Sequence, residues 1–181
     1  MGLLPEYHAV LTCDLPVEQV NHRLSVMPLS VSGTKYVKRE TPDSVNHFAF
    51  SRPRPRLHPM LKKGVSHLDF LPKVDITTIS GTEHTEVRLF FRPEGIVVFH
   101  SLSLLAFVLL VEPILISAFF RSPPDHSLLF PIFILPAAFI LSLCADTHMI
   151  RKYSKHLLTQ IAYDLSVYHV PELKRGCSFE Q

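Results

Sequence analysis

An acid inside an apolar segment is the first feature of this sequence that could carry chemistry. Residues 102–120 read LSLLAFVLLVEPILISAFF, in which Glu112 is followed directly by Pro113. A carboxyl group within a membrane is a functional candidate by default, because its burial costs at least about 2.5 kcal/mol near the bilayer centre. Glu112 is therefore a candidate for ligand binding, proton transfer or contact with a partner subunit.

The position of Glu112 along this segment favours a simpler role. If a membrane span begins near Ile96, Glu112 lies about 24 Å along a helix that rises about 1.5 Å per residue. That position is close to the outer boundary of a hydrocarbon core about 30 Å thick, where a glutamate reaches headgroups or water. The sequence favours an interfacial anchor and leaves the functional role as the alternative. His100 lies about 120° away from Glu112 around the helix, so the two residues do not share a face.

A second polar pair, Asp146 and His148, ends the next apolar run. We interpret both as interfacial residues that contact water or a partner protein. No pair of histidines among the 11 has HxxH or HxxxH spacing, and the 3 cysteines are far apart. The sequence also lacks GxSxG, HExxH, P-loop and GxGxxG patterns. We therefore predict no catalytic residue, no metal site and no cofactor.

The clearest charge cluster lies in the proline-rich segment RPRPRLHPMLKK. Its basic side chains could each gain about 1 kcal/mol from anionic lipid headgroups, or bind a phosphorylated ligand or an acidic surface of a partner. A solvated loop is an equally good interpretation. The candidate contact residues are Arg52, Arg54, Arg56, Lys62 and Lys63.

The distribution of charge separates a soluble part from a membrane part. Residues 1–95 contain twelve Lys or Arg and ten Asp or Glu, whereas residues 95–145 contain only Glu112, Arg121 and Asp125 as charged residues. The formal net charge of +2 gives no indication of nucleic-acid binding. We expect the partners to be a lipid bilayer and, as an alternative, another membrane protein.

Two apolar runs predict a transmembrane hairpin. The first, 96–120, has 25 residues and one charge, and the second begins at residue 128 and extends to about 148. The polar turn RSPPDHS between them is too short for any arrangement except a hairpin. Basic residues flank the spans on the side away from this turn, so the positive-inside rule places both termini in the cytoplasm.

The remaining segments predict an α+β domain with a mostly antiparallel sheet. Alternating residues indicate strands at 7–15, 45–51, 65–72, 74–80 and 86–93, with another strand possible at 35–40 and a hairpin turn at 80–86. Val17, Val20, Leu24 and Met27 predict a short helix that Asp14 caps. The predicted organisation is 1–94 for the cytosolic domain and 95–149 for the hairpin.

The C-terminal part predicts an amphipathic helix at 150–170, ended by Pro171, and a tail at 171–181. Its apolar residues recur at helical spacing from Ile150 to Tyr168, with Lys152 and Lys155 on other faces. We expect this helix to pack on the cytosolic sheet. A helix lying on the membrane surface or a coil between two copies is the alternative.

The order of these parts resembles a type of small bacterial membrane protein that has no settled activity. The similarity covers roughly residues 7–165 and rests on HFAF…RLHPMLKKGVSHLDF, VDITTIS, TEVRLFFRP before the hairpin, and MIRKYSKHLLTQI. It implies an N-terminal α+β domain, a two-helix membrane hairpin and a C-terminal amphipathic helix. The chain departs from that pattern in RPRPRLHP, whose prolines exclude an interior strand.

These observations predict a hairpin-anchored membrane protein whose cytosolic domain is a binding, regulatory or scaffolding module. The resemblance to bacterial proteins implies that its membrane is the inner membrane of a bacterial cell. The alternative is an accessory subunit of a larger membrane complex, in which Glu112 and the proline-containing second span contact partner helices. Enzymatic activity is the third and weakest interpretation. It requires a catalytic group between the sheet and the membrane, and the sequence does not reveal one.

Overall fold

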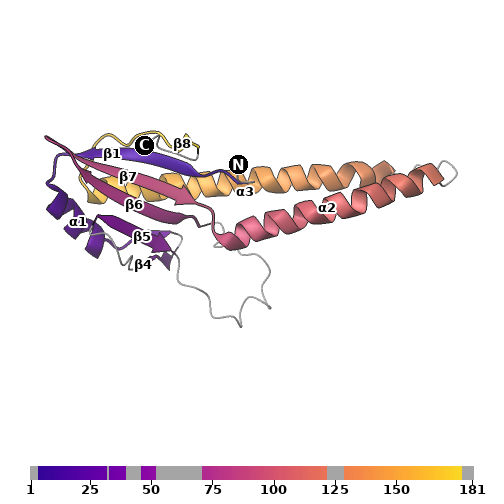
Figure 1. Cartoon of the computed structure of the whole chain (residues 1–181), viewed down its shortest axis with the longest axis horizontal. Helices are drawn as coiled ribbons and strands as arrows, with labels where there is room; N and C mark the ends of the chain where they lie inside the picture. Colours follow the sequence, from indigo (N-terminus) through magenta and orange to yellow (C-terminus); the bar gives the residue numbers. More distant parts are fainter. Residues whose placement is uncertain (1–3, 32, 40–45, 52–70, 122–128, 177–181) are drawn as a thin grey trace.

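The protein is elongated, with an α+β domain at one end and two long helices that extend from it (Figure 1). The structure, a computed structural model, describes residues 4–31, 33–39, 46–51, 71–121 and 129–176. The expected fold class, α+β with a mostly antiparallel sheet and two long apolar helices, is confirmed.

The domain is built on a six-stranded sheet with the strand order β4-β5-β6-β7-β1-β8, and all of its pairs are antiparallel. Because β1 lies between β7 and β8, the two ends of the described chain meet at one edge of the sheet (Figure 1). The strands are β1 (Tyr7–Cys13), β4 (Val37–Arg39), β5 (His47–Ser51), β6 (Lys73–Ser80), β7 (Thr85–Arg92) and β8 (Lys174–Arg175). A separate small sheet pairs β2 (Ser30–Val31) with β3 (Thr34–Lys35).

Alternation along the strands gives the sheet one buried face. In β1 the side chains of Ala9 and Leu11 are 3% and 1% exposed, and they lie opposite Leu89 and Val87 of β7. The intervening residues of both strands point to the other face and are more exposed. This period of two is the pattern expected for a sheet covered on one side. The predicted turn at 80–86 is confirmed, because β6 and β7 are adjacent antiparallel strands that it joins.

The short helix α1 (Val17–Val26) packs on the buried face through Val20 and Leu24. The prediction that Asp14 caps it is wrong, because the residue at the N-cap position is Pro16 and no side chain caps the helix. Asp14 instead forms an ion pair with His84 at 2.9 Å. Asp14 lies two residues before the N-cap position, and Pro16 at that position has no side-chain acceptor with which to cap the helix.

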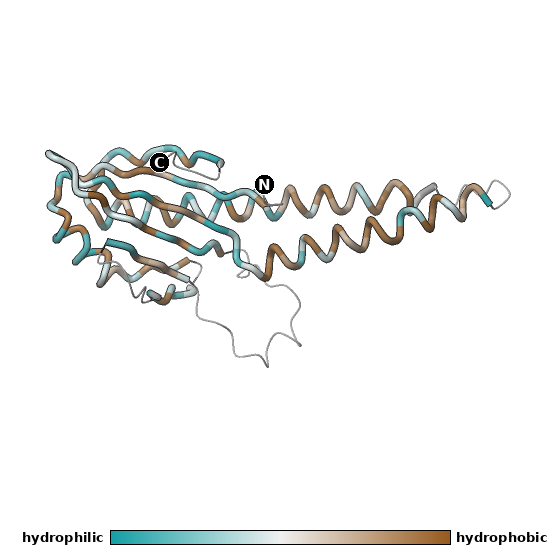
Figure 2. Tube along the Cα trace, in the orientation of Figure 1, coloured by the Kyte–Doolittle hydropathy of each residue, from teal (hydrophilic) through white to brown (hydrophobic). Residues whose placement is uncertain are grey.

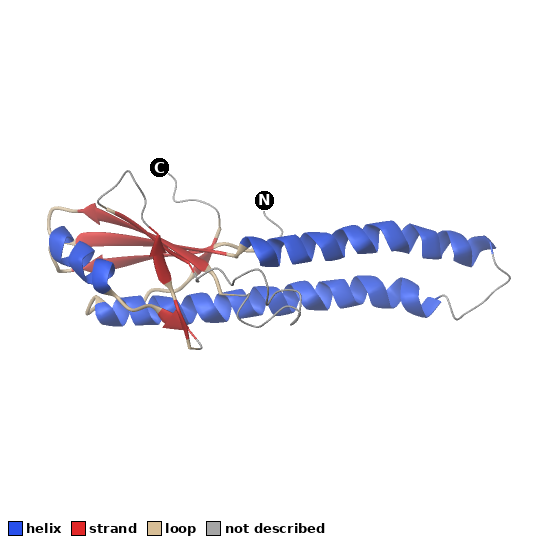
Figure 3. Ribbon diagram, turned by 90° about the horizontal axis from the view of Figure 1, so that it is seen from below, coloured by secondary structure: helices blue, strands red, loops and turns tan. Residues whose placement is uncertain are grey.

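The hairpin follows the sheet with almost no linker. β7 ends at Arg92, and after Pro93 and Glu94 the helix α2 (Gly95–Arg121) begins. The chain returns through α3 (Leu129–Asp164), which lies beside α2 in both views (Figures 1 and 3). Figure 2 shows that apolar residues dominate α2 and the first part of α3. The sheet therefore holds one arm of the hairpin directly.

A single helix replaces the two helices predicted for the C-terminal part. The sequence predicts a span at 128–148 and a separate amphipathic helix at 150–170, but α3 is continuous from Leu129 to Asp164. Residues 145–150 contain neither Gly nor Pro, so nothing in the local sequence ends the helix there. The second part of α3 contributes Ile150, Leu157 and Ile161, each 0% exposed, to the same core as the sheet.

The end of α3 is also earlier than predicted. The helix ends at Asp164 rather than at Pro171, because Ser166 adopts a left-handed conformation with φ of 62°. The amide of Val167 donates to the carbonyl of Ala162 at 2.8 Å, and the amide of Ser166 donates to the carbonyl of Tyr163 at 3.0 Å. These two bonds form a Schellman motif, which closes the helix with hydrogen bonds instead of a proline.

The predicted strand at 65–72 falls mainly outside the described residues. Leu71 and Pro72 are described, and both are buried just before β6 begins. Leu71 is 1% exposed and belongs to the core.

Candidate functional site at the base of the hairpin

A buried polar contact joins the two arms where they meet the domain. Ser101 of α2 and Asp146 of α3 are 1% and 4% exposed, and the serine Oγ lies 3.2 Å from Oδ2 of the aspartate. The same hydroxyl lies 3.0 Å from the carbonyl of Val97, so its single proton is shared between two acceptors. Because a buried carboxyl group without a hydrogen bond is costly, this contact specifies how the arms align.

His100 adds a second polar group at this level. It precedes Ser101 and is half-buried near Asp146. Its Nδ1 atom is buried, and no group in the described part of the chain forms a hydrogen bond with it. The base of the hairpin thus contains an imidazole, a hydroxyl and a carboxyl group from two helices.

Asp146 and His148, which the sequence treats as one polar pair, point in different directions. Two residues along a helix are separated by about 200°, so their side chains lie on nearly opposite faces. Asp146 is buried against α2, whereas His148 is exposed and lines a groove on the other side of α3. The two residues do not form a joint site.

Glu112 lies on the face of α2 that turns toward α3. The buried residues of α2 are Val97, Ser101 and Val108, and Glu112 follows Val108 by one turn on the same line. Its side chain is half-buried, and no described residue forms an ion pair with it. Eleven residues separate it from Ser101, which is about 16 Å along the helix. Glu112 and Asp146 are therefore separate polar positions on one interhelical seam.

The basic cluster of the proline-rich segment lies outside the described residues. Nothing in the structure bears on Arg52, Arg54, Arg56, Lys62 or Lys63. Within the described ranges, no three His, Cys, Asp or Glu side chains converge in a group that could hold a metal ion.

A groove of about 640 Å³ opens between α3 and the edge of the sheet. One wall is a stripe of α3, and the other comes from the beginning of β1 and the C-terminal segment around β8. The lining residues are Tyr7, Ile140, Leu143, Cys144, Thr147, His148, Arg151, Leu173 and Arg175. Sequence reasoning missed this groove, although Cys144, His148 and Arg151 share a helical face by their spacing.

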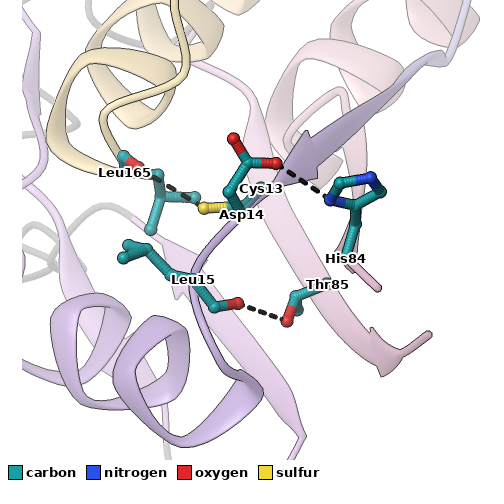
Figure 4. Close-up of polar contacts among 6 residues, drawn as sticks. All are labelled: Cys13, Asp14, Leu15, His84, Thr85 and Leu165. Atoms are coloured by element: carbon teal, nitrogen blue, oxygen red, sulfur yellow. Dashed lines mark hydrogen bonds and ion pairs between the residues drawn. The ribbon is translucent and has the colours of Figure 1, made fainter. Parts of the chain in front are cut away.

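The opposite end of the domain carries a second, smaller hollow of about 400 Å³. Beside it, the thiol of Cys13 donates to the carbonyl of Leu165 at 3.4 Å, and Asp14 pairs with His84 (Figure 4). These contacts tie the end of α3 to the far ends of β1 and β7. The Asp14 and His84 side chains are 91% and 51% exposed, so their ion pair adds little stability.

Comparison with protein-family models, with curated proteins and with solved structures finds no match to this chain. The features of the chain that bear on its function are the two arms, the seam between them and the groove at their base.

Proposed function

We propose that this chain is a membrane protein anchored by the α2–α3 hairpin, with its α+β domain on the cytoplasmic side as a binding, regulatory or scaffolding module. The observation that carries the proposal is the exposure of two long apolar helices. The most apolar window of each helix has a mean hydropathy of 2.4 or 1.7, and only 6% of either window is buried. The apolar core helix of a soluble protein would be largely buried, so a lipid environment is the natural cover for these surfaces.

The charges around the domain support its cytoplasmic placement. Arg151, Lys152 and Lys155 are exposed where α3 leaves its apolar part, and Arg92 ends the strand that leads into α2. Basic residues at this end of both spans favour the cytoplasmic side under the positive-inside rule. The continuous α3 connects the anchor rigidly to the sheet core, so binding at the domain is held at a fixed distance from the membrane.

An accessory subunit of a larger membrane complex is the second candidate. Glu112 favours it, because a half-buried carboxylate in an apolar seam without a described ion-pair partner is a suitable contact for a polar group of another helix. The two candidates differ in what the purified protein carries with it.

A gentle-detergent pull-down of the tagged full-length chain distinguishes the candidates. The Glu112→Gln variant tests the acid, and Arg121→Gln at the end of α2 is the control for loss of one charge. The proposal predicts that all three forms run as the same small species. A membrane partner that is lost only with Glu112→Gln would establish the accessory subunit instead. Recovery of the chain in the soluble fraction would contradict both candidates.

A further inference from the structure

The groove at the base of the hairpin changes character along its length. Ile140, Leu143 and Cys144 line the end nearer the apolar hairpin, while His148 and Arg151 follow on the same stripe of α3. From residue 140 to residue 151 the helix rises about 16 Å. The groove is therefore apolar at one end and basic at the other.

The opposite wall supplies a second arginine at the basic end. Arg175 lies on β8 directly opposite Tyr7 of β1, and both residues line the groove. Gly176 follows with a φ of 151°, a conformation that residues with a side chain rarely adopt. Its amide donates to the carbonyl of Glu6 at 3.3 Å, which fixes the strand that presents Arg175.

Two cations elsewhere at the same end of the sheet have acidic partners. Lys73 lies 3.9 Å from Glu94, and Arg92 lies 3.7 Å from Asp75. Arg151 and Arg175 are exposed, and the described part of the chain offers neither of them an ion pair. The described residues that line the groove include no carboxylate.

We propose that this groove binds one anionic phospholipid, with its phosphate at the two arginines and part of an acyl chain along the apolar end. The inference rests on the proposed membrane anchorage, because the groove then opens where α3 leaves the hydrocarbon region. Guanidinium groups bind phosphate oxygens through paired N–H donors. The volume of the groove lies in the range of small-molecule sites, about 300–1,000 Å³.

The test measures lipids bound to the full-length protein by native mass spectrometry in detergent, with phosphatidylglycerol or phosphatidylcholine added. The variant is Arg151→Ala with Arg175→Ala. The control is Lys152→Ala with Lys155→Ala, which removes the same charge from residues of α3 that do not line this groove. Thermal unfolding of each form shows whether it is folded.

The wild type should retain phosphatidylglycerol in preference to phosphatidylcholine. Loss of both arginines should weaken phosphatidylglycerol binding by about 25-fold, at about fivefold for each charge near a lipid surface. The lysine control should keep most of the affinity. Equal weakening by both double variants, or no preference in the wild type, would overturn the site.

Two further measurements test whether the ligand is a lipid or a soluble phosphate compound, and whether the chain is anchored in a membrane. Inorganic phosphate is added as a competitor, and complete displacement of the lipid by phosphate at a low concentration would show a site for a soluble phosphate compound instead. Membranes that contain the wild type or the same variants are also treated with alkaline carbonate. Wild-type protein that resists extraction but shows no lipid preference refutes the groove alone, whereas wild-type protein that is extracted refutes the membrane anchorage.

Discussion

The two halves of α3 contain similar apolar side chains in opposite surroundings. In the first half Phe133 and Leu141 are each 69% exposed, whereas in the second half Leu157 and Leu158 are 0% and 1% exposed in the sheet core. Most exposed positions of the second half are instead polar, as at Lys152, Lys155 and Thr159. The second half is covered by the chain itself, and the first half needs a cover from outside the chain.

This difference indicates how the molecule is divided. The change in exposure along α3 occurs within about three turns, between Leu141 and Arg151. Asp146, which bonds to Ser101, lies in this stretch. Apolar residues alone do not distinguish the halves, but the residues on the opposite face do.

The largest effect is expected from truncating a side chain in the buried half. Leu158→Ala should lower the free energy of unfolding by about 2–5 kcal/mol, because it removes packed methyl groups and leaves a cavity. Leu141→Ala in the exposed half should change it by about 0.5 kcal/mol or less. Thermal unfolding in detergent, followed by circular dichroism, measures both. Equal losses would show that the first half is also packed within the chain.

A charge tests the solvent of each half directly. Leu141→Arg should disfavour membrane insertion by about 2.5–3.5 kcal/mol, because the side chain lies near the middle of the span. Tyr163→Arg is the matched control, since Tyr163 is 82% exposed but lies in the second half of α3. The fraction of each variant that resists carbonate extraction is the measurement. Similar fractions for both variants would show that the two halves of α3 do not lie in different surroundings.

The seam between the arms is tested by a double-mutant cycle. Ser101→Ala and Asp146→Ala should show a coupling energy of about 1 kcal/mol, because their side chains share a buried hydrogen bond. Ser103 lies two residues after Ser101 and is exposed on nearly the opposite face of α2, so Ser103→Ala with Asp146→Ala should be additive. Unfolding in detergent measures all variants. A coupling energy near zero for the first pair would show that this hydrogen bond does not stabilise the folded protein.

The smallest effect is a pH dependence at the end of the buried half. Burial raises the pKa of Asp164 above its usual range, so the folded state holds this proton more tightly than the unfolded chain. The contribution to stability is complete below the unfolded pKa and is lost as the pH rises through the folded pKa. Asp164→Asn does not ionise and should escape this loss. Urea unfolding over a pH series should therefore show the variant gaining stability relative to the wild type as pH rises. A difference in unfolding free energy that stays constant with pH would contradict this prediction.

The coarse architecture was predictable from sequence because it depends on patterns that are local. The length and low charge of 96–120 predict a long apolar helix without any knowledge of its neighbours, and α2 covers Gly95–Arg121. The strand candidates 74–80 and 86–93 match β6 and β7 within one residue at each end. Such signals depend on the period of side chains along one element.

The features that the sequence did not predict depend on the exact end of an element or on residues that are distant in the sequence. Asp14 is a good helix cap by type, but α1 begins after Pro16 rather than directly after Asp14, and the Asp14 carboxylate lies beside His84. The groove depends on the pairing of Tyr7 with Arg175, which brings the two ends of the chain together across β1 and β8. Ser101 has no distinguishing sequence signal, because its function in the fold comes from Asp146 on the other arm.

The central claim is that the hairpin crosses a membrane and the sheet remains on one side. The most direct test places single cysteines at Arg121, the end of α2, and at Lys155, on the exposed face of the second half of α3, in a background without other cysteines. Sealed vesicles of each orientation are treated with a membrane-impermeant maleimide. The account predicts that the Arg121→Cys and Lys155→Cys proteins react from opposite sides of the membrane. Reaction of both from the same side would show that the hairpin does not cross.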